Sequence, residues 1–249
     1  MRIKARATRV ALVPVLLFAA VGCGGTDTPA ADKAPAAKDS PAAASGAPGA
    51  PAGSATPRPA PTGLERAALE QGDLAGYQIS AQGKNPNAPD GQPQSDKKAC
   101  QPLADIMGDK PDPAARQTVN RGIGSQKAVG LAVSASVSSY DEAGAKRVLS
   151  RLREAVAACS SGFTATVEQQ TGTYKDVKAA SYKTPGDESV SWTTTVAAQN
   201  VSAQVHLVVV REGDTVVRLM ALNLAAADQK ALVPREVVDK QLEKVKKVA

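Results

Sequence analysis

The sequence predicts an α+β protein, with an antiparallel β-sheet meander packed on one face by amphipathic helices, in a single domain at residues 63–249. Four extended runs with alternating apolar residues occur between residues 129 and 222. Two helical stripes, at 145–159 and 234–247, flank the last three runs. Consecutive strands with helices before and after them favour an α+β sheet over alternating βαβ units.

The domain is expected to begin with a short helix. Thr62 and Glu65 have the spacing of a capping box, which predicts a helix over Leu64–Gln71 that ends at Gly72-Asp73. The elements expected next are an extended segment containing Tyr77 and Ile79, a polar loop over residues 83–98 and a short helix over Leu103–Met107.

In the middle of the domain the spacing of apolar residues changes from every second residue to every third or fourth. Apolar residues alternate with small ones from Val129 to Ser138, which predicts a strand with one apolar face and one small polar face. The polar face carries Ser134, Ser136 and Ser138. An amphipathic helix then follows, with the stripe Ala145, Val148, Leu149, Leu152, Ala155, Val156 and Cys159.

The C-terminal part is expected to form hairpins and a last helix. The predicted strands are Val190–Ala198, Ala203–Val209 and Val216–Leu222, with turns at Gln199-Asn200 and Glu212-Gly213-Asp214. The last helix should run from Pro234, a good first helical residue, to Lys247. Trp192 shares a face with Val190 and Val196, which favours core packing over ligand stacking.

Residues 1–22 have the anatomy of a secretory signal peptide. Four basic residues precede an apolar run at Val10–Val21 that is too short to span a membrane. The segment Ala20-Val21-Gly22-Cys23 resembles the bacterial lipobox, whose cysteine is acylated and becomes the new N-terminus. This resemblance implies a palmitate-type lipid on Cys23 and an anchor at the extracytoplasmic face of the cell membrane. An ordinary secretory peptide followed by a chance cysteine is the alternative.

Residues 23–62 would form a lipidated N-terminus and a disordered Ala/Pro-rich linker, because they lack apolar periodicity and aromatic residues. Removing residues 1–22 takes away four of the 30 Lys and Arg and none of the 24 Asp and Glu, which leaves a net charge of +2. A charge this small gives no indication of nucleic-acid binding.

Cys100 and Cys159 are the two cysteines that remain after Cys23. An even pair in an exported domain predicts a disulfide, which would tie the 145–159 helix to the Cys100 segment. Two separate buried thiols are the alternative. A redox pair is disfavoured because the chain has no CxxC spacing.

The motifs of common enzymes are missing, so we predict a protein that is not an enzyme and uses no cofactor or metal. The single histidine, His206, should lie on the outer face of a strand, and no GxSxG elbow accompanies it. Gly122-Ile123-Gly124-Ser125 is interpreted as a turn or strand end, without the pattern of a phosphate-binding loop. The Lys244, Lys246 and Lys247 cluster is expected to compensate the helix dipole; contact with anionic lipid headgroups is the alternative.

Several short segments, in their order and spacing, carry a family resemblance over residues 64–248. They are Asp73–Tyr77, Cys100–Leu103, Val137–Tyr140, the helix Ala145–Cys159 and Gly186–Ser189. Together they resemble actinobacterial surface lipoproteins and the extracellular sensor domain of mycobacterial protein-kinase-H-type kinases. The resemblance implies an extracytoplasmic α+β domain of sensing or binding type. The kinase domains carry two disulfides around a cleft, whereas this chain can form only one.

We therefore expect a membrane-anchored lipoprotein that acts as a non-enzymatic binding or sensor module. Its partner would be a small ligand or an envelope protein, bound on a concave face of the sheet. The candidate binding residues are Tyr140, Tyr174, Tyr182 and Asp187. Two alternatives remain open, namely a carrier of a lipid or other hydrophobic ligand and a protein–protein adaptor.

Overall fold

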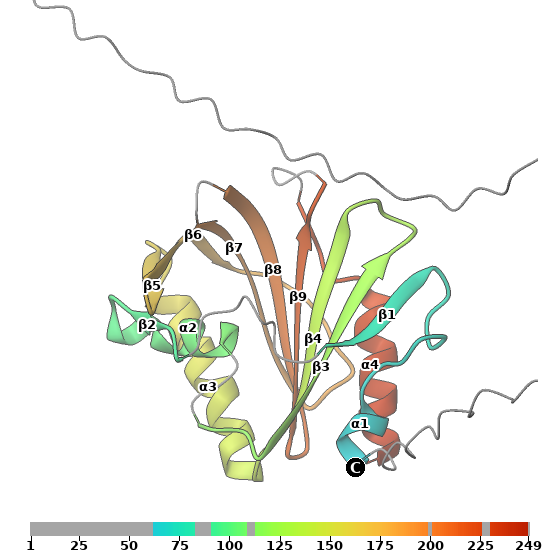
Figure 1. Ribbon diagram of the computed structural model, residues 1–249. Helices are drawn as coiled ribbons and strands as arrows, with labels where there is room; N and C mark the ends of the chain where they lie inside the picture. Colours follow the sequence, from blue (N-terminus) through green and yellow to red (C-terminus); the bar gives the residue numbers. More distant parts are fainter. Residues whose placement is uncertain (1–61, 83–90, 109–112, 199–200, 226–229, 249) are drawn as a thin grey trace, which may run out of the picture. The chain divides into compact units, whose positions relative to one another are not determined.

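The computed structural model describes residues 62–82, 91–108, 113–198, 201–225 and 230–248, which all lie in one compact unit. In this part of the chain a nine-stranded antiparallel sheet has the order β1-β3-β4-β9-β8-β7-β6-β5-β2 (Figure 1). Four α-helices accompany the sheet, so the predicted α+β class is confirmed. The leader, the linker and the turn at Gln199-Asn200 lie outside the described residues.

The elements follow in chain order. The helices are α1 (Gly63–Ala67), η1 (Lys98–Cys100, a 3-10 turn), α2 (Gln101–Met107), α3 (Glu142–Ala158) and α4 (Arg235–Val248). The strands are β1 (Tyr77–Gln82), β2 (Gln94–Ser95), β3 (Gln117–Ser125), β4 (Leu131–Ser139), β5 (Phe163–Val167), β6 (Gln170–Ala179), β7 (Glu188–Ala198), β8 (Val201–Glu212) and β9 (Thr215–Asn223). Among the described residues no helix is long and apolar enough to cross a membrane.

The helices lie on both faces of the sheet, which corrects the expectation of one covered face. Val208 and Val210 of β8 pack with α1 and α4, whereas Val205, Leu207 and Val209 pack with α2 and α3. Because neighbouring residues of a strand point to opposite faces, α3 and α4 must lie on opposite sides of β8. Figure 1 shows the two helices at opposite flanks of the sheet.

Four strands, β2, β3, β5 and β6, were not predicted from the sequence as strands. The most consequential is β3, whose last four residues are Gly122–Ser125; of the two interpretations of this segment, a turn or a strand end, the structure shows the strand end. β5 and β6 form a hairpin after α3, and β6 carries a bulge between Lys175 and Lys178. Val129, expected at the start of β4, lies in the β3–β4 turn with its side chain 86% exposed.

Helix α1 has the predicted capping box between Thr62 and Glu65 but ends at Ala67, four residues early. The reason is a contact with α4. The fully buried amide of Gln241 donates to the Ala67 carbonyl at 2.6 Å and accepts from the Leu69 N–H at 3.2 Å. Ala68 between the two bonded residues is extended, with φ −84° and ψ 153°, so α1 ends there.

We expect Gln241→Leu to lower the free energy of unfolding by roughly 2 kcal/mol, because it leaves a buried carbonyl and a buried N–H unpaired. Urea unfolding followed by circular dichroism measures the change. Asp239→Asn, at an exposed position of the same helix, is the control and should change stability by less than about 0.5 kcal/mol. Equal stabilities for the two variants would show that the amide does not hold the α1 connection.

The predicted disulfide between Cys100 and Cys159 is present and ties η1 to the end of α3. It closes the cluster formed by α2, α3 and one face of β5–β8, with Leu149, Leu152 and Trp192 at its centre. The α3 N-terminus is capped by Asp141, whose carboxylate accepts from the Gly144 N–H at 2.6 Å. This cluster fixes the position of α2, which borders the candidate site.

Candidate functional site

One region of the sheet belongs to neither apolar cluster. On β1, β3 and β4, the residues that face the α2/α3 side are absent from both clusters, although their sequence neighbours fill the α1/α4 cluster. We call this region, with the adjoining positions of β9, the open face. Its serines at 136 and 138 are buried, and Met220 and Leu222 of β9 pack against the α2/α3 cluster. Its members are Gln78, Ser80, Thr118, Asn120, Gly122, Gly124, Ala132, Ser134, Ser136, Ser138, Arg218, Met220 and Leu222.

The strand register arranges the open face in rows that cross the strands. The first row is Gln78, Gly124, Ala132 and Leu222, and the second is Ser80, Gly122, Ser134 and Met220. The third row is Asn120, Ser136 and Arg218. Successive rows lie about 7 Å apart, since each strand residue rises roughly 3.3 Å. The face therefore changes from small and apolar at one end to polar at the other.

Arg218 is the centre of the polar end. Its guanidinium donates to the Ser136 hydroxyl at 2.6 Å and to the Ile106 carbonyl of α2 at 3.0 Å, and it lies 3.4 Å from the Ser134 hydroxyl. The Ser136 hydroxyl in turn donates to the Asn120 side-chain oxygen at 2.8 Å. These contacts fix the orientation of a half-buried cation whose planar fork suits carboxylate and phosphate groups.

Two hollows lie on the open face. A small cavity of about 20 Å³, enough for one water molecule, lies between Arg218, Asn120 and Tyr140. A shallow groove of about 380 Å³ runs over Gly122, Gly124 and Ala132 to Leu222 and Leu224. Ser134 lines the groove and also contacts Arg218, so the groove begins beside the guanidinium.

The charge of the open face is unusual for an uncovered sheet surface. Among its described members Arg218 is the single charged residue, and no carboxylate is present. A sheet face exposed only to water typically alternates with charged and long polar side chains. Here the side chains of glycine, alanine and serine are short, which leaves room for a ligand to approach the sheet backbone.

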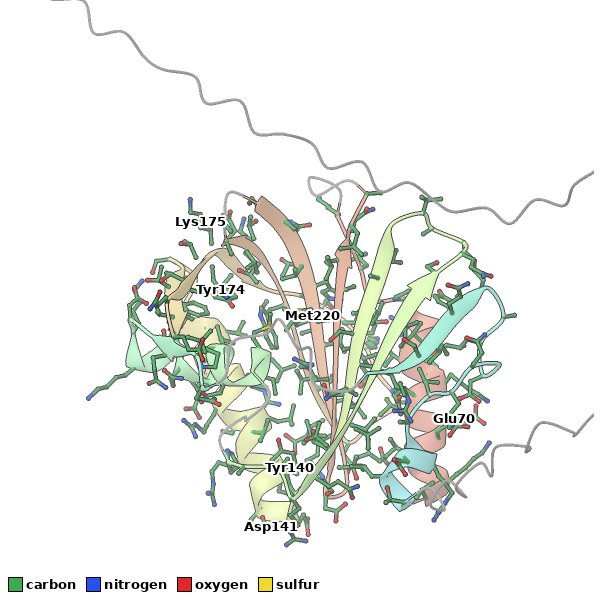
Figure 2. The ribbon with its side chains drawn as sticks, in the orientation of Figure 1. Glu70, Tyr140, Asp141, Tyr174, Lys175 and Met220 are labelled. Carbon is green, nitrogen blue, oxygen red and sulfur yellow. A yellow bond between two sulfur atoms is a disulfide. The ribbon has the colours of Figure 1, made fainter. Side chains whose placement is uncertain are left out.

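The predicted site residues Tyr140 and Tyr174 lie on the α2/α3 side of the sheet. Figure 2 shows Tyr140 at the lower end of the sheet, Tyr174 at the left, and Met220 near the middle of the sheet. Tyr140 is buried, lines the small cavity and has its pKa raised to about 12 by that burial. Tyr174 stacks on Phe163 with ring centres 4.5 Å apart, and burial raises its pKa.

Tyr182 and Asp187 lie away from the open face. Tyr182 packs against the α1/α4 cluster and donates to the Val233 carbonyl at 3.0 Å, and burial raises its pKa. Asp187 pairs with the buried Arg211 at 2.9 Å and accepts from the Gly213 N–H at 3.0 Å. The structure therefore brings Tyr140 to the polar end of the open face and leaves Tyr182 and Asp187 elsewhere.

His206 was expected on an outer sheet face, but the structure buries it to 1% exposure beneath the segment that enters α4. Its Nε2 lies 2.8 Å from the Ser191 hydroxyl, which itself donates to the Leu207 carbonyl at 2.9 Å. Its Nδ1 accepts from the Val233 N–H at 3.0 Å. The ring is therefore neutral and protonated at Nε2, and the Ser191–His206 pair is a packing contact rather than a nucleophile–base pair.

Arg218 was not predicted as a site residue, because it lies inside a strand of mainly apolar residues. The one available signal was the serine face of β4, which was noted without a partner. The three lysines at the end of α4 each contact another group of the same domain. Lys244 pairs with Asp73 at 2.7 Å, Lys246 donates to the Pro185 carbonyl, and Lys247 pairs with Glu243.

The fold has similarities among solved structures. The extracellular domain of PknH from Mycobacterium tuberculosis matches with a TM-score of 0.47 and 13% sequence identity, over 74% of this chain and 94% of that chain. An uncharacterized protein from Mycobacterium smegmatis, an Rv0999 ortholog, matches with a TM-score of 0.37 and 12% identity, over 69% of this chain and 90% of that chain. The first of these two structures is a domain of the type that the sequence motifs resemble.

A scan of protein-family models gives no match to this chain. A search of curated protein sequences gives no match either.

Proposed function

We propose that this protein is an extracytoplasmic lipoprotein, anchored by Cys23, whose domain binds a small ligand on the open face without chemically changing it. The observation that carries the proposal is the pairing of a positioned guanidinium with an uncovered groove. Arg218 is fixed by Ser136 and Ile106, and the groove beside it has a floor of glycine and alanine. Binding sites commonly combine an apolar surface with a few well-placed polar groups.

The arrangement supports binding more than catalysis. Among the described residues, the functional groups of the open face are hydroxyls, two amides and one guanidinium, and the face includes neither a histidine nor a carboxylate. Such groups orient and hold a ligand through hydrogen bonds. A sensor or binding module requires this and no more.

The binding part of the proposal is tested with residues 24–249, exported to an oxidising compartment behind an unrelated secretory leader and mixed with an envelope extract. Native mass spectrometry should show a retained small-molecule adduct on the unsubstituted protein. Gly124→Ile should lose the adduct, because a Cβ at Gly124 meets no atom within 4 Å and the new side chain would fill the groove. Ser202→Ile, at an exposed β8 position on the opposite face, should keep it.

An adduct that survives Gly124→Ile, or no adduct from any envelope fraction, would contradict binding on the open face. The anchoring part has its own test in the natural chain. Labelled palmitate should be incorporated by the unsubstituted protein and not by Cys23→Ala, which should appear in the medium rather than in the membrane fraction. Equal labelling of both would show that Cys23 is not the acylated residue.

A further inference from the structure

Among the described residues the sheet has two edge strands, β1 at the right of Figure 1 and β2 at the left. An edge strand presents a row of backbone N–H and C=O groups to which another chain can add. At the start of β1 the Gly76 carbonyl accepts from the Gln126 N–H, which follows β3, at 2.9 Å. Because successive residues of a strand direct these groups to opposite sides, the N–H and C=O groups of Tyr77 and Ile79 point away from β3.

A glutamine side chain covers two of these outward groups. The Gln71 amide accepts from the Ile79 N–H at 2.8 Å and donates to the Tyr77 carbonyl at 3.4 Å. A carboxamide has the donor and the acceptor of a peptide group, so it bonds an edge strand as a neighbouring strand would. The Gln71 side chain therefore occupies the place that a further strand would take beside β1.

The segment that carries Gln71 is held on both sides. Before it, the Leu69 carbonyl accepts from the Arg121 guanidinium at 2.7 Å. After it, the Asp73 carboxylate pairs with Lys244 of α4, also at 2.7 Å. These contacts place the Gln71 amide beside β1 independently of the two bonds that it makes there.

The other edge of the sheet has the same arrangement. The Gln101 amide accepts from the Ser95 N–H of β2 at 2.8 Å and donates to the Pro93 carbonyl at 2.7 Å. The Asp96 N–H donates to the Thr164 carbonyl of β5 at 2.9 Å, so the Ser95 N–H points away from β5. At both edges one amide therefore bonds an outward C=O and the outward N–H two residues later.

The two edges differ in their other protection. β2 has two residues, follows Pro93 and precedes Lys97 and Lys98, and a short strand, a proline and lysines each disfavour strand addition. β1 has six residues, which include no charged residue and no proline. Closure of the β1 edge therefore depends on Gln71 more than closure of the β2 edge depends on Gln101.

We infer that the Gln71 amide prevents β1 from pairing with β1 of a second copy of this chain. Two copies of one strand pair antiparallel about a two-fold axis, and uncharged strands meet there without like-charge repulsion. Gln78 and Ser80 of β1 belong to the open face, so such pairing would continue the open face into the second copy. With Gln71 in place, the open face ends at β1 and belongs to one domain.

The test measures self-association of residues 24–249 by sedimentation velocity over a series of protein concentrations. Gln71→Ala should associate at least about tenfold more tightly than the unsubstituted protein, because pairing at β1 no longer displaces two hydrogen bonds. The unsubstituted protein should remain monomeric at concentrations where Gln71→Ala is partly dimeric.

Two matched variants locate the contact. Gln101→Ala removes the corresponding amide at β2 and should leave self-association unchanged. Adding Ala81→Pro to Gln71→Ala should restore the monomer. Residue 81 directs its N–H outward, as Ile79 does, and proline has no N–H to give to a partner strand.

Amide hydrogen exchange at Ile79 is a second measurement, made at a concentration where both proteins are monomeric. The Ile79 N–H should exchange faster in Gln71→Ala, because its acceptor has been removed. Equal exchange rates, or unchanged self-association of Gln71→Ala, would overturn the inference. So would equal association of Gln101→Ala, or dimers that persist with Ala81→Pro, because association would then arise elsewhere than at β1.

Discussion

Replacing both Cys100 and Cys159 by alanine should lower the free energy of unfolding by about 4 kcal/mol. The bridge closes a loop of 59 residues, and cross-linking a loop of that length removes a corresponding amount of entropy from the unfolded chain. Both cysteines are buried within the α2/α3 cluster, so alanine avoids placing a hydroxyl there. An effect this large is a substantial part of the total stability of an ordinary domain.

Urea unfolding of the oxidised protein and of the double variant measures the difference. Reduced unsubstituted protein is the control, because it should unfold at nearly the same urea concentration as the variant. The same variant should also weaken ligand binding. α2 is held at one end by the bridge and supplies the Ile106 carbonyl that orients Arg218. A change below about 1 kcal/mol, or unaltered binding, would show that packing alone fixes α2.

The elements that were predictable from the sequence are those with strong local periodicity. The alternation from Leu131 to Val137 and the stripe of α3 each identify an element without reference to any other part of the chain. The β8–β9 turn at Gly213-Asp214 was predictable for the same reason, since turn residues separate two clear strands. These signals are local, and the structure confirms them.

The missed strand β3 shows why the site itself was not predictable. Gly122 and Gly124 were interpreted as part of a turn or of a strand end, because glycine usually interrupts strands, and no strand was predicted before them. In the structure they lie between β1 and β4, where side chains would fill the groove. Their small size serves the open face, which exists only after distant segments have paired. No pattern within residues 117–125 carries that information.

Arg218 was not predicted as a site residue, and the four residues that were predicted do not lie together, because both facts depend on strand register. Arg218 is identified as a site residue by the register that places it opposite Ser136, which lies 82 positions earlier in the chain. Tyr140, Tyr174, Tyr182 and Asp187 were grouped by residue type. The sheet separates them because Tyr182 packs on the α1/α4 face, which was not expected to be covered.

The stability of the domain should fall as the pH is lowered from about 6.5 to about 4, through the protonation of His206. Burial lowers the pKa of His206 from 6.5 to about 4. Between these values the unfolded chain binds a proton at this ring and the folded chain does not, so acid favours unfolding. The contribution is fully present above pH 6.5 and is lost as the pH falls toward 4, with a total of roughly 3 kcal/mol.

The hydrogen bonds of His206 explain why the folded protein resists protonation. A second proton on the ring would have to go on Nδ1, which accepts from the Val233 N–H at 3.0 Å. Two N–H groups would then face each other at the start of the segment that leads into α4. Ser191 lies at Nε2 and does not contact the proton on Nδ1, and its hydroxyl already donates to the Leu207 carbonyl at 2.9 Å.

Urea unfolding between pH 4 and pH 8 measures this dependence, with His206→Gln as the matched variant that cannot take up a proton. Hydrogen bonds from Lys127 and Lys247 lower the pKa values of Glu236 and Glu243. These carboxylates lose their contribution to stability below about pH 4.5, and they do so in both proteins. The difference between the two curves should therefore develop mainly between pH 6.5 and 4.5. Parallel curves over that interval would contradict a neutral buried imidazole. Curves that converge, so that His206→Gln is less stable than the unsubstituted protein at pH 8 but not near pH 4, would establish two points. The folded domain keeps the His206 ring uncharged, and acid destabilises the domain for that reason.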